Sequence, residues 1–208
     1  MIFKNSFLFF EKKIRSIYLK SSIYNKKISS FNDSSLKYRP SLSLLGSVIK
    51  YNKKKINIEN YSLDEIWIDQ NLMEKDYDNL NSFFWLFSLD LKSSKKDTQN
   101  IILQWIEKNN KYSSKSWKID IMAKRVIAWI SNSKLTYDDG GIVYRNKFNN
   151  IIKKQINHLV NEIKRDQWVD DKMIGCAAII LTGLSYGDKE QYLNIGLNLL
   201  KRIIRSSF

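Results

Sequence analysis

The residue types that can move protons or hold a metal are few in this chain. His158 is its single histidine, so an imidazole acid or base would have to be this residue. His158 lies in a strongly amphipathic helical pattern beside Leu159, which favours a structural or surface histidine over a catalytic one. One histidine and one cysteine, Cys176, do not supply the usual ligands of zinc. We therefore expect no metal site and assign no catalytic residue.

Acidic pairs and glycines offer no alternative centre. The segment DDGGIV, residues 138–143, has two glycines but lacks the Gly-Lys-Ser/Thr sequence of a phosphate-binding loop. Asp170 and Asp171 are placed as carboxylates commonly are at the start of a helix, where they favour its positive end. The sequence therefore indicates no cofactor.

Three side chains are candidates for contacting a ligand without transforming it. Arg125 lies in WKIDIMAKRVIAWIS, residues 117–131, and its planar guanidinium group can pair with a carboxylate. The alternative for Arg125 is a structural ion pair, buried or on the helix surface. Trp117 lies near the end of an element, where an indole face can contact a ligand, although core packing is the alternative. With His158, these residues form the candidate substrate-binding set.

Charge and composition narrow the classes of partner. The net charge is +14, with 35 Lys and Arg against 21 Asp and Glu, which favours nucleic acid, an anionic membrane or an acidic polysaccharide. A coding bias toward Lys, Asn and Ile would give the same charge. Hydrophobic residues make up 43% of the chain, which is typical of a globular protein. The sequence shows neither a signal peptide nor an apolar run long enough for a membrane span, so we expect a soluble, cytoplasmic protein, with the periplasm as the alternative.

Hydrophobic periodicity then predicts the elements that position these residues. We expect an N-terminal basic arm with a short helix over 1–40, an extended or hairpin segment over 41–75, and a helical domain over 76–208. Within that domain, Ile119, Met122, Val126 and Trp129 recur at helical spacing, as do Phe148, Ile152, Ile156, Leu159 and Ile163. The later segment DDKMIGCAAIILTGLSYGD is apolar nearly all round, which is typical of a helix buried between neighbours. The predicted fold class is all-α, with antiparallel helix pairs in layers.

The succession of segments resembles a known family. FFWLFSLDL, ILQWIEKN, WKIDIMAKRVIAWIS, FNNIIKKQINHLVNEI and IGCAAIILTGLSY, in this order, resemble the N-terminal helical region of bacterial heparinase II/III-like proteins. The resemblance covers roughly residues 40–205. Its most specific part is Trp117, Arg125, Trp129, Ile130 and Ser131, followed by Gln155, His158 and Leu159.

This resemblance implies an incomplete α/α toroid that carries the first part of a groove for an acidic polysaccharide. Proteins of the family are polysaccharide lyases that cut beside a uronic acid by β-elimination. The Asn or His, Tyr and His that perform the reaction come from later toroid helices and from a β-sandwich-like domain, so no catalytic residue is carried onto this chain. We expect a truncated or split protein that is not catalytic alone, with a separately encoded C-terminal β-domain as a partner.

An exposed apolar edge near Leu193, Leu197 and Ile204 would mark the docking site of that partner. Two other functions remain open. One is a helical domain that binds anionic polysaccharide without cutting it, which predicts saturable, salt-dependent binding and no unsaturated product. The other is a nucleic-acid-binding helical protein, which charge alone suggests and which predicts lysines on one face beside exposed aromatic residues.

Overall fold

The computed structural model describes residues 2–29, 35–37, 74–89, 95–187 and 189–207. These residues form helices and short connections and contain no strand, so the all-α prediction is confirmed for them. The extended or hairpin segment predicted for 41–75 lies outside the described residues, apart from its last two, which begin a helix. No helix in the described ranges combines the length and the apolar character that crossing a membrane requires.

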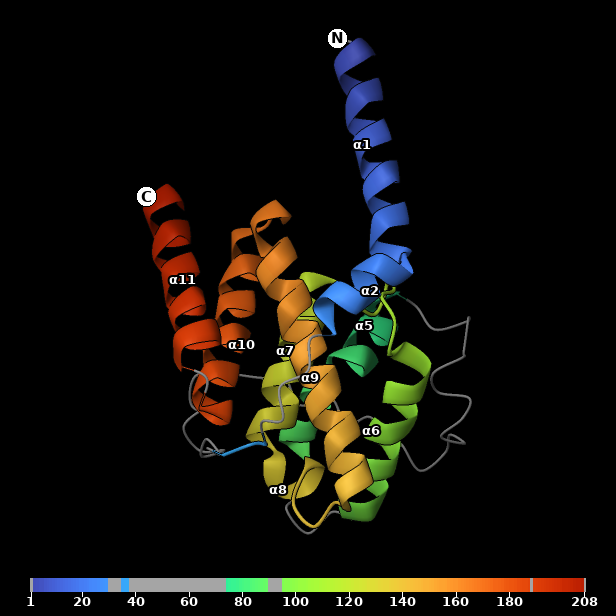
Figure 1. Ribbon diagram of the computed structural model, residues 1–208, viewed down its shortest axis with the longest axis vertical. Helices are drawn as coiled ribbons and strands as arrows, with labels where there is room; N and C mark the ends of the chain where they lie inside the picture. Colours follow the sequence, from blue (N-terminus) through green and yellow to red (C-terminus); the bar gives the residue numbers. More distant parts are fainter. Residues whose placement is uncertain (1, 30–34, 38–73, 90–94, 188, 208) are drawn as a thin grey trace.

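Successive long helices in the second half of the chain alternate in direction (Figure 1), and they pack in antiparallel pairs. The chain passes in order through α1 (Ile2–Lys20), α2 (Ser22–Ile28), α5 (Glu74–Ser82), the 3₁₀ turn η2 (Phe84–Ser88), α6 (Lys95–Asn109), α7 (Ile119–Ser131), α8 (Ser133–Thr136), α9 (Ile142–Glu162), the 3₁₀ turn η3 (Ile163–Arg165), α10 (Val169–Tyr186), the π turn η4 (Lys189–Leu193) and α11 (Asn194–Ser207).

Helix α7 lies at the centre of the body and contacts α5, α9 and α10. Three residues of its predicted inward face, Met122, Val126 and Trp129, are fully buried, and Ile119 packs partly buried against the same core. Its other sides are covered too, because residues such as Ile121 and Ile130 are also buried. A helix that is apolar nearly all round is stable only when neighbours surround it, and α7 meets that condition.

Aromatic rings fill the space between α6, α7 and α9. The ring centroids of Trp105 and Trp129 are 5.4 Å apart, and Trp129 stacks on Phe148 with centroids 5.5 Å apart. Trp105 Nε1 donates to Asn81 Oδ1 at 2.9 Å, so the polar atom of this buried indole has a partner. The apolar face predicted for α9, Phe148, Ile152, Ile156, Leu159 and Ile163, is confirmed as fully buried.

Glycines allow close approach around α10, because Gly183 of α10 faces Leu193 of η4 and Gly196 of α11 faces Ile180 of α10. A Cβ atom on Gly183 would lie 2.4 Å from the backbone nitrogen of Leu193, and one on Gly196 would lie 2.7 Å from the side chain of Ile180. Helix α10 packs between α7 and α11, as expected for a helix buried between neighbours, although Leu184 and Ala177 are exposed. Neighbouring helices cover the sides of α10 that face α7 and α11 but leave these two residues in contact with solvent.

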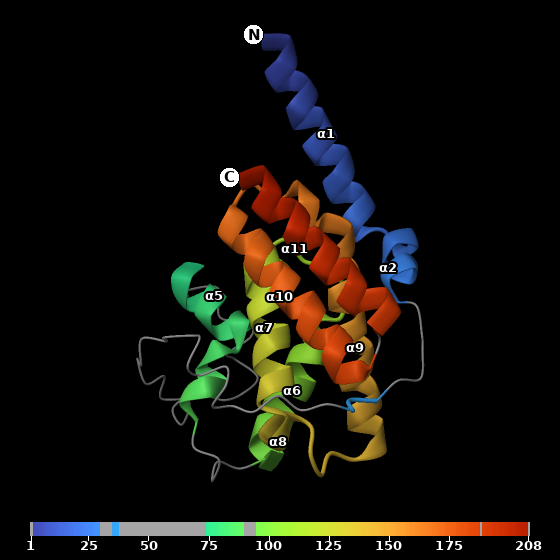
Figure 2. The ribbon, with the colours of Figure 1, turned by 90° about the vertical axis from the view of Figure 1, so that its left-hand side faces the viewer.

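The N-terminal arm contains two helices. Helix α1 has 19 residues and projects away from the body, as both views show (Figures 1 and 2), while α2 lies against α9. Ser21 caps the start of α2, because its side chain accepts a hydrogen bond from the Tyr24 backbone N–H. Asn157 of α9 donates to the Ile28 carbonyl oxygen at 2.9 Å, and this bond fixes the end of α2. The arm therefore places α2 beside the middle of α9.

Candidate functional site

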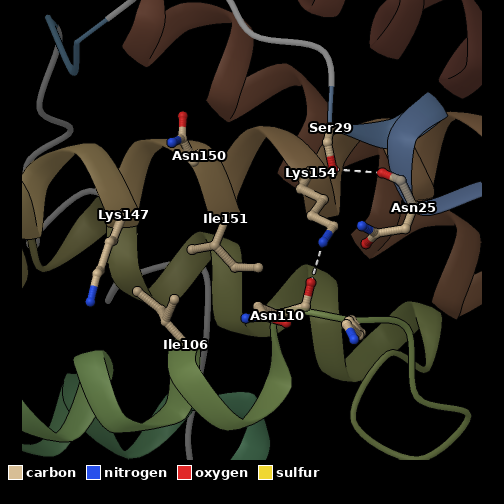
Figure 3. Close-up of a pocket in the computed structure, with 9 residues that line it drawn as sticks. Asn25, Ser29, Ile106, Asn110, Lys147, Asn150, Ile151 and Lys154 are labelled. Carbon is tan, nitrogen blue, oxygen red and sulfur yellow. Dashed lines mark hydrogen bonds between the residues drawn. The ribbon is translucent and has the colours of Figure 1, made fainter. Parts of the chain in front are cut away.

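A pocket of about 380 Å³ lies where α2, the end of α6 and α9 meet. We call it the basic pocket, and Figure 3 shows the residues that line it. Its polar lining is made of lysines, asparagines and a serine, and two isoleucines provide its apolar part. The lining residues are Asn25, Ser29, Ile106, Asn110, Lys111, Lys147, Asn150, Ile151 and Lys154.

Helix α9 supplies the largest share of this lining because of its periodicity. Lys147, Asn150, Ile151 and Lys154 recur three or four residues apart, so they lie on one face of the helix. Ile151 is buried, and it meets Ile106 of α6 at the base of the pocket (Figure 3). The two ammonium groups thus extend from one side of α9, beside the apolar surface, while the Asn150 side chain points the other way (Figure 3).

Lys154 is the cation most enclosed by the pocket. Its ammonium donates to the backbone carbonyl oxygen of Asn110, and it lies 6.0 Å from the centroid of the Trp117 ring. Burial, with a smaller contribution from the charge of Lys111, lowers the pKa of Lys154. An anion bound beside Lys154 would relieve both effects, because it would balance a charge that is partly removed from water.

Lys147 lies nearer the mouth of the pocket. It donates to Glu107 Oε1 at 2.9 Å, and both side chains are exposed to solvent. An exposed pair of this kind contributes little to stability, since water and salt screen the two charges. Lys147 can therefore exchange Glu107 for an anionic ligand at small cost.

Helix α2 closes the pocket on the opposite side. The Asn25 side chain points toward the same space as the Lys154 ammonium (Figure 3). Asn25 Oδ1 is buried and accepts no hydrogen bond from any residue that the structure describes. Buried amide oxygens are usually satisfied, so Asn25 can accept a hydrogen bond from a ligand hydroxyl.

These groups suit binding better than proton transfer. The lining described above contains no imidazole and no carboxylate that could act as a base. Ammonium groups pair with carboxylate or sulfate, and side-chain amides both donate to and accept from hydroxyls. The basic pocket is thus equipped to hold a polar ligand that carries both anionic groups and hydroxyls.

A second cleft, of about 390 Å³, lies farther along α9, where the loop before α7 meets the α9–α10 connection. We call it the His158 cleft. Tyr112, Trp117 and His158 line it, together with the carboxylates Asp120, Glu162, Asp166 and Asp171 and the cations Lys118 and Arg165. Because charges of both signs surround it, the His158 cleft does not select for an anion in the way the basic pocket does.

The structure brings together two of the candidate residues inferred from sequence. The rings of Trp117 and His158 meet edge to face, with centroids 5.4 Å apart, and both residues line the His158 cleft. Trp117 is buried and its Nε1 donates to the Asn109 carbonyl oxygen at 3.1 Å. Trp117 also lies between the two cavities, since its ring is close to Lys154 as well.

His158 is buried and keeps a neutral ring. Its Nδ1 and the Tyr24 hydroxyl are 2.8 Å apart and share a hydrogen bond. Burial lowers the pKa of His158 to about 3, and the charge of Arg15 acts in the same direction. Arg15 in turn forms an ion pair with Glu162, with Nε 2.9 Å from Oε2 and a second contact between the guanidinium and Oε1. These contacts attach the N-terminal arm to α9.

Arg125, the third candidate residue, lies in the interior and lines neither of the two cavities. Its three nitrogens donate to Gln155 Oε1 at 2.8 Å, to the Asn81 carbonyl oxygen at 2.7 Å and to the Ser116 carbonyl oxygen at 3.0 Å. The guanidinium carbon also lies 4.0 Å from the centroid of the Trp105 ring. Arg125 thus connects α5, α7, α9 and the loop before α7, which is a structural role.

Lys147 and Lys154 were not among the candidate residues inferred from the sequence. The available signal was the spacing of Lys147, Asn150 and Lys154, which predicts one shared polar face. Nothing in the sequence showed that Asn25, more than 100 positions earlier, lies opposite that face.

Within the ranges that the structure covers, no group of three or more His, Cys, Asp or Glu side chains is arranged to hold a metal ion. Comparison of the chain with protein-family models, with curated proteins and with solved structures finds no match. The candidate site therefore stands on the geometry of its residues.

Proposed function

We propose that this chain binds an acidic polysaccharide that contains uronic acid, and that the basic pocket holds one of its anionic sugars. The observation that carries the proposal is the composition of that pocket: three lysines and three asparagines surround a base formed by Ile106 and Ile151. A uronate residue offers a carboxylate, several hydroxyls and a ring with apolar C–H groups. Each of these groups has a counterpart in the lining.

The charges favour this ligand in a specific way. A carboxylate between Lys147 and Lys154 would pair with both ammonium groups and restore the lowered pKa of Lys154 toward its ordinary value. Ligand hydroxyls would meet the amides of Asn25 and Asn110. An isolated inorganic anion would use only the lysines, so the amides and isoleucines favour a sugar.

The arrangement of the helices supports the resemblance that the sequence suggested. We infer that α9, α10 and α11 belong to the α/α toroid of a heparinase II/III-like protein, in which antiparallel helix pairs follow one another around a ring. Leu197 and Ile204 of α11 and Leu184 of α10 are exposed, which suits a surface on which further helices or a partner pack. We propose a separately encoded C-terminal β-domain as that partner and as the source of the groups for β-elimination.

A nucleic acid is a less suitable ligand for the same pocket. Sequence-tolerant binding of single strands depends on aromatic side chains on which bases stack. The lining of the basic pocket includes no aromatic residue, and the nearby Trp117 ring is buried. The amide-rich lining therefore favours sugars over bases.

Titration calorimetry of the whole chain with uronic-acid oligosaccharides, at two salt concentrations, tests the proposal. We expect saturable binding that weakens as the salt concentration rises. The double substitution Lys147→Gln with Lys154→Gln should weaken this binding about tenfold or more, since two charge-assisted contacts are lost. The matched control is Lys134→Gln with Lys201→Gln, two exposed lysines outside the pocket, which removes the same charge.

Three outcomes would contradict the proposal. Equal weakening in the control and pocket variants would show that net charge alone attracts the ligand. Tighter binding of single-stranded nucleic acid than of any uronate oligosaccharide would favour the alternative ligand class. Unsaturated uronate formed by this chain alone, seen by its ultraviolet absorbance, would show that the chain carries its own catalytic groups.

A further inference from the structure

Helix α1 carries an apolar face that the rest of the described structure leaves uncovered. Phe10, Ile14 and Ile17 recur four and three residues apart and so share one side of the helix. Their exposed fractions are 62%, 52% and 65%, and neighbouring Phe9 is 70% exposed. Scattered apolar residues on a surface are ordinary, but four large ones on one projecting helix mark an interaction surface.

The opposite side of α1 is attached to the body. Arg15 forms its ion pair with Glu162 of α9, and Leu19 is buried beside the His158 cleft. At 100° per residue, Arg15 and Leu19 lie roughly opposite the centre of the Phe10, Ile14 and Ile17 face. The attachment therefore leaves the apolar face exposed to solvent.

Lysines accompany this apolar face. Lys13 and Lys20 lie on its border in the helical projection, and both are exposed. Glu11, the one acidic residue in α1, lies one turn before Arg15 and so on the side nearer the body. Helix α2, which follows α1, also has an exposed apolar residue, Ile23 at 71%, and two exposed lysines, Lys26 and Lys27.

We propose that α1 lies on an anionic lipid surface, with Phe10, Ile14 and Ile17 in the headgroup region and Lys13 and Lys20 against lipid phosphates. A helix with an apolar face and a basic border binds such a surface by apolar burial together with attraction to anionic headgroups. Helix α1 rests in the surface and does not cross the bilayer, because it is too polar to span it.

Charge distinguishes a lipid surface from a second copy of this chain. Two α1 helices packed through their apolar faces would bring Lys13 and Lys20 of one copy close to the same lysines of the other. Like charges at such a contact oppose association, whereas anionic headgroups neutralise them. The chain as a whole carries +14, which adds to both effects.

Flotation of the full chain with lipid vesicles tests this inference. We expect the protein to float with vesicles of phosphatidylcholine and phosphatidylglycerol and to remain behind with phosphatidylcholine alone. Phe10→Ser with Ile17→Ser should weaken the binding about tenfold or more, because two large apolar side chains no longer enter the lipid. Ile142→Ser with Val143→Ser is the matched control, since these two residues of α9 are each 68% exposed.

A second pair of variants separates lipid binding from the function proposed for the basic pocket. Lys13→Gln with Lys20→Gln should weaken vesicle binding and leave oligosaccharide binding unchanged. Lys147→Gln with Lys154→Gln should do the reverse. Thermal unfolding followed by circular dichroism should show the same midpoint for all of these variants, since every substituted side chain is exposed or half-exposed.

Several results would overturn the inference. One is the absence of binding to anionic vesicles at low salt. Another is equal loss in the α1 and α9 serine variants. A third is a wild-type dimer, found by sedimentation, that the α1 serine variant dissociates while vesicle binding is absent, which would assign the face to a second copy.

Discussion

The interior around Arg125 and the basic pocket both contain positive charge, yet the two regions use it differently. Every nitrogen of Arg125 already donates to a protein oxygen, and the Trp105 ring covers its planar face. Lys147 and Lys154 face an open cavity and have weaker or single protein partners. Arg125 is fully buried and lines neither cavity, so a ligand cannot reach it, whereas the two lysines can rearrange to meet one.

Removing the charge at Arg125 should have the largest effect on stability. Arg125→Met keeps a side chain over Trp105 but leaves three buried oxygens, from Asn81, Ser116 and Gln155, without their donor. We expect a loss of about 3 kcal/mol or more in the free energy of unfolding, because each buried group left unpaired costs about 1–3 kcal/mol. Urea unfolding followed by tryptophan fluorescence measures it.

The neighbouring Lys124→Met is the control for that experiment. Lys124 pairs with Asp120 one turn away at 2.9 Å, and both side chains are partly exposed, so its loss should change stability by about 0.5 kcal/mol or less. An Arg125→Met variant as stable as the wild type would show that the cost of burying the guanidinium cancels its three hydrogen bonds.

Lowering the pH should reduce the free energy of unfolding through His158, by an amount between those expected for the Arg125 variant and for the pocket lysine variant. The folded pKa of His158, about 3, lies below its ordinary value of 6.5, so the folded state takes up this proton less readily than the unfolded chain. This contribution to stability is complete above about pH 6.5 and is lost as the pH falls from there toward 3. At pH 5 the loss should be about 2 kcal/mol.

The comparison variant for this pH dependence is His158→Gln. Its stability should fall less between pH 7 and pH 5 than that of the wild type, and urea unfolding at both pH values gives the difference. Equal slopes for the two proteins would mean that His158 accepts a proton in the folded state as readily as in the unfolded state.

The smallest change in stability should come from the lysines of the basic pocket. Lys147→Gln with Lys154→Gln should alter the free energy of unfolding by about 0.5 kcal/mol, because the Lys147 ion pair is screened by solvent and Lys154 is only half-buried, with one carbonyl as its hydrogen-bond partner. The same urea titration measures it. A loss as large as that expected for Arg125→Met would make these lysines structural and would remove the contrast between the two regions.

Much of the fold follows from periodicity in the sequence. The buried faces of α7 and α9 were predicted because apolar residues recur at helical spacing and few polar residues interrupt them. The exposure of Leu184 and Ala177 was not predicted, since periodicity indicates which residues are apolar but not how many neighbouring helices cover them. The full length of α1 was also missed, because lysines and serines weaken its pattern.

The candidate site was less predictable for a physical reason. Two of the three oxygens that accept hydrogen bonds from Arg125 are backbone carbonyl oxygens, of Asn81 and Ser116. Because every residue has a backbone carbonyl, the residue types in the sequence cannot indicate these partners. Trp117 and His158 were both candidates, but their contact depends on how the loop before α7 folds over α9. The basic pocket combines residues from α2, α6 and α9, so it exists only once these segments have met.

The attachment of the N-terminal arm has a consequence for the order of folding. The contacts between Arg15 and Glu162, between Tyr24 and His158 and between Ile28 and Asn157 join residues 147, 134 and 129 positions apart. Contacts that close such long loops are slow to form, whereas α9 and α10 are consecutive and pair locally. We expect α2 to dock after the helical body has assembled. The side of the basic pocket that carries Asn25 should therefore form last during folding and detach first during unfolding. A ligand that touches both walls would therefore slow unfolding by holding the arm in place.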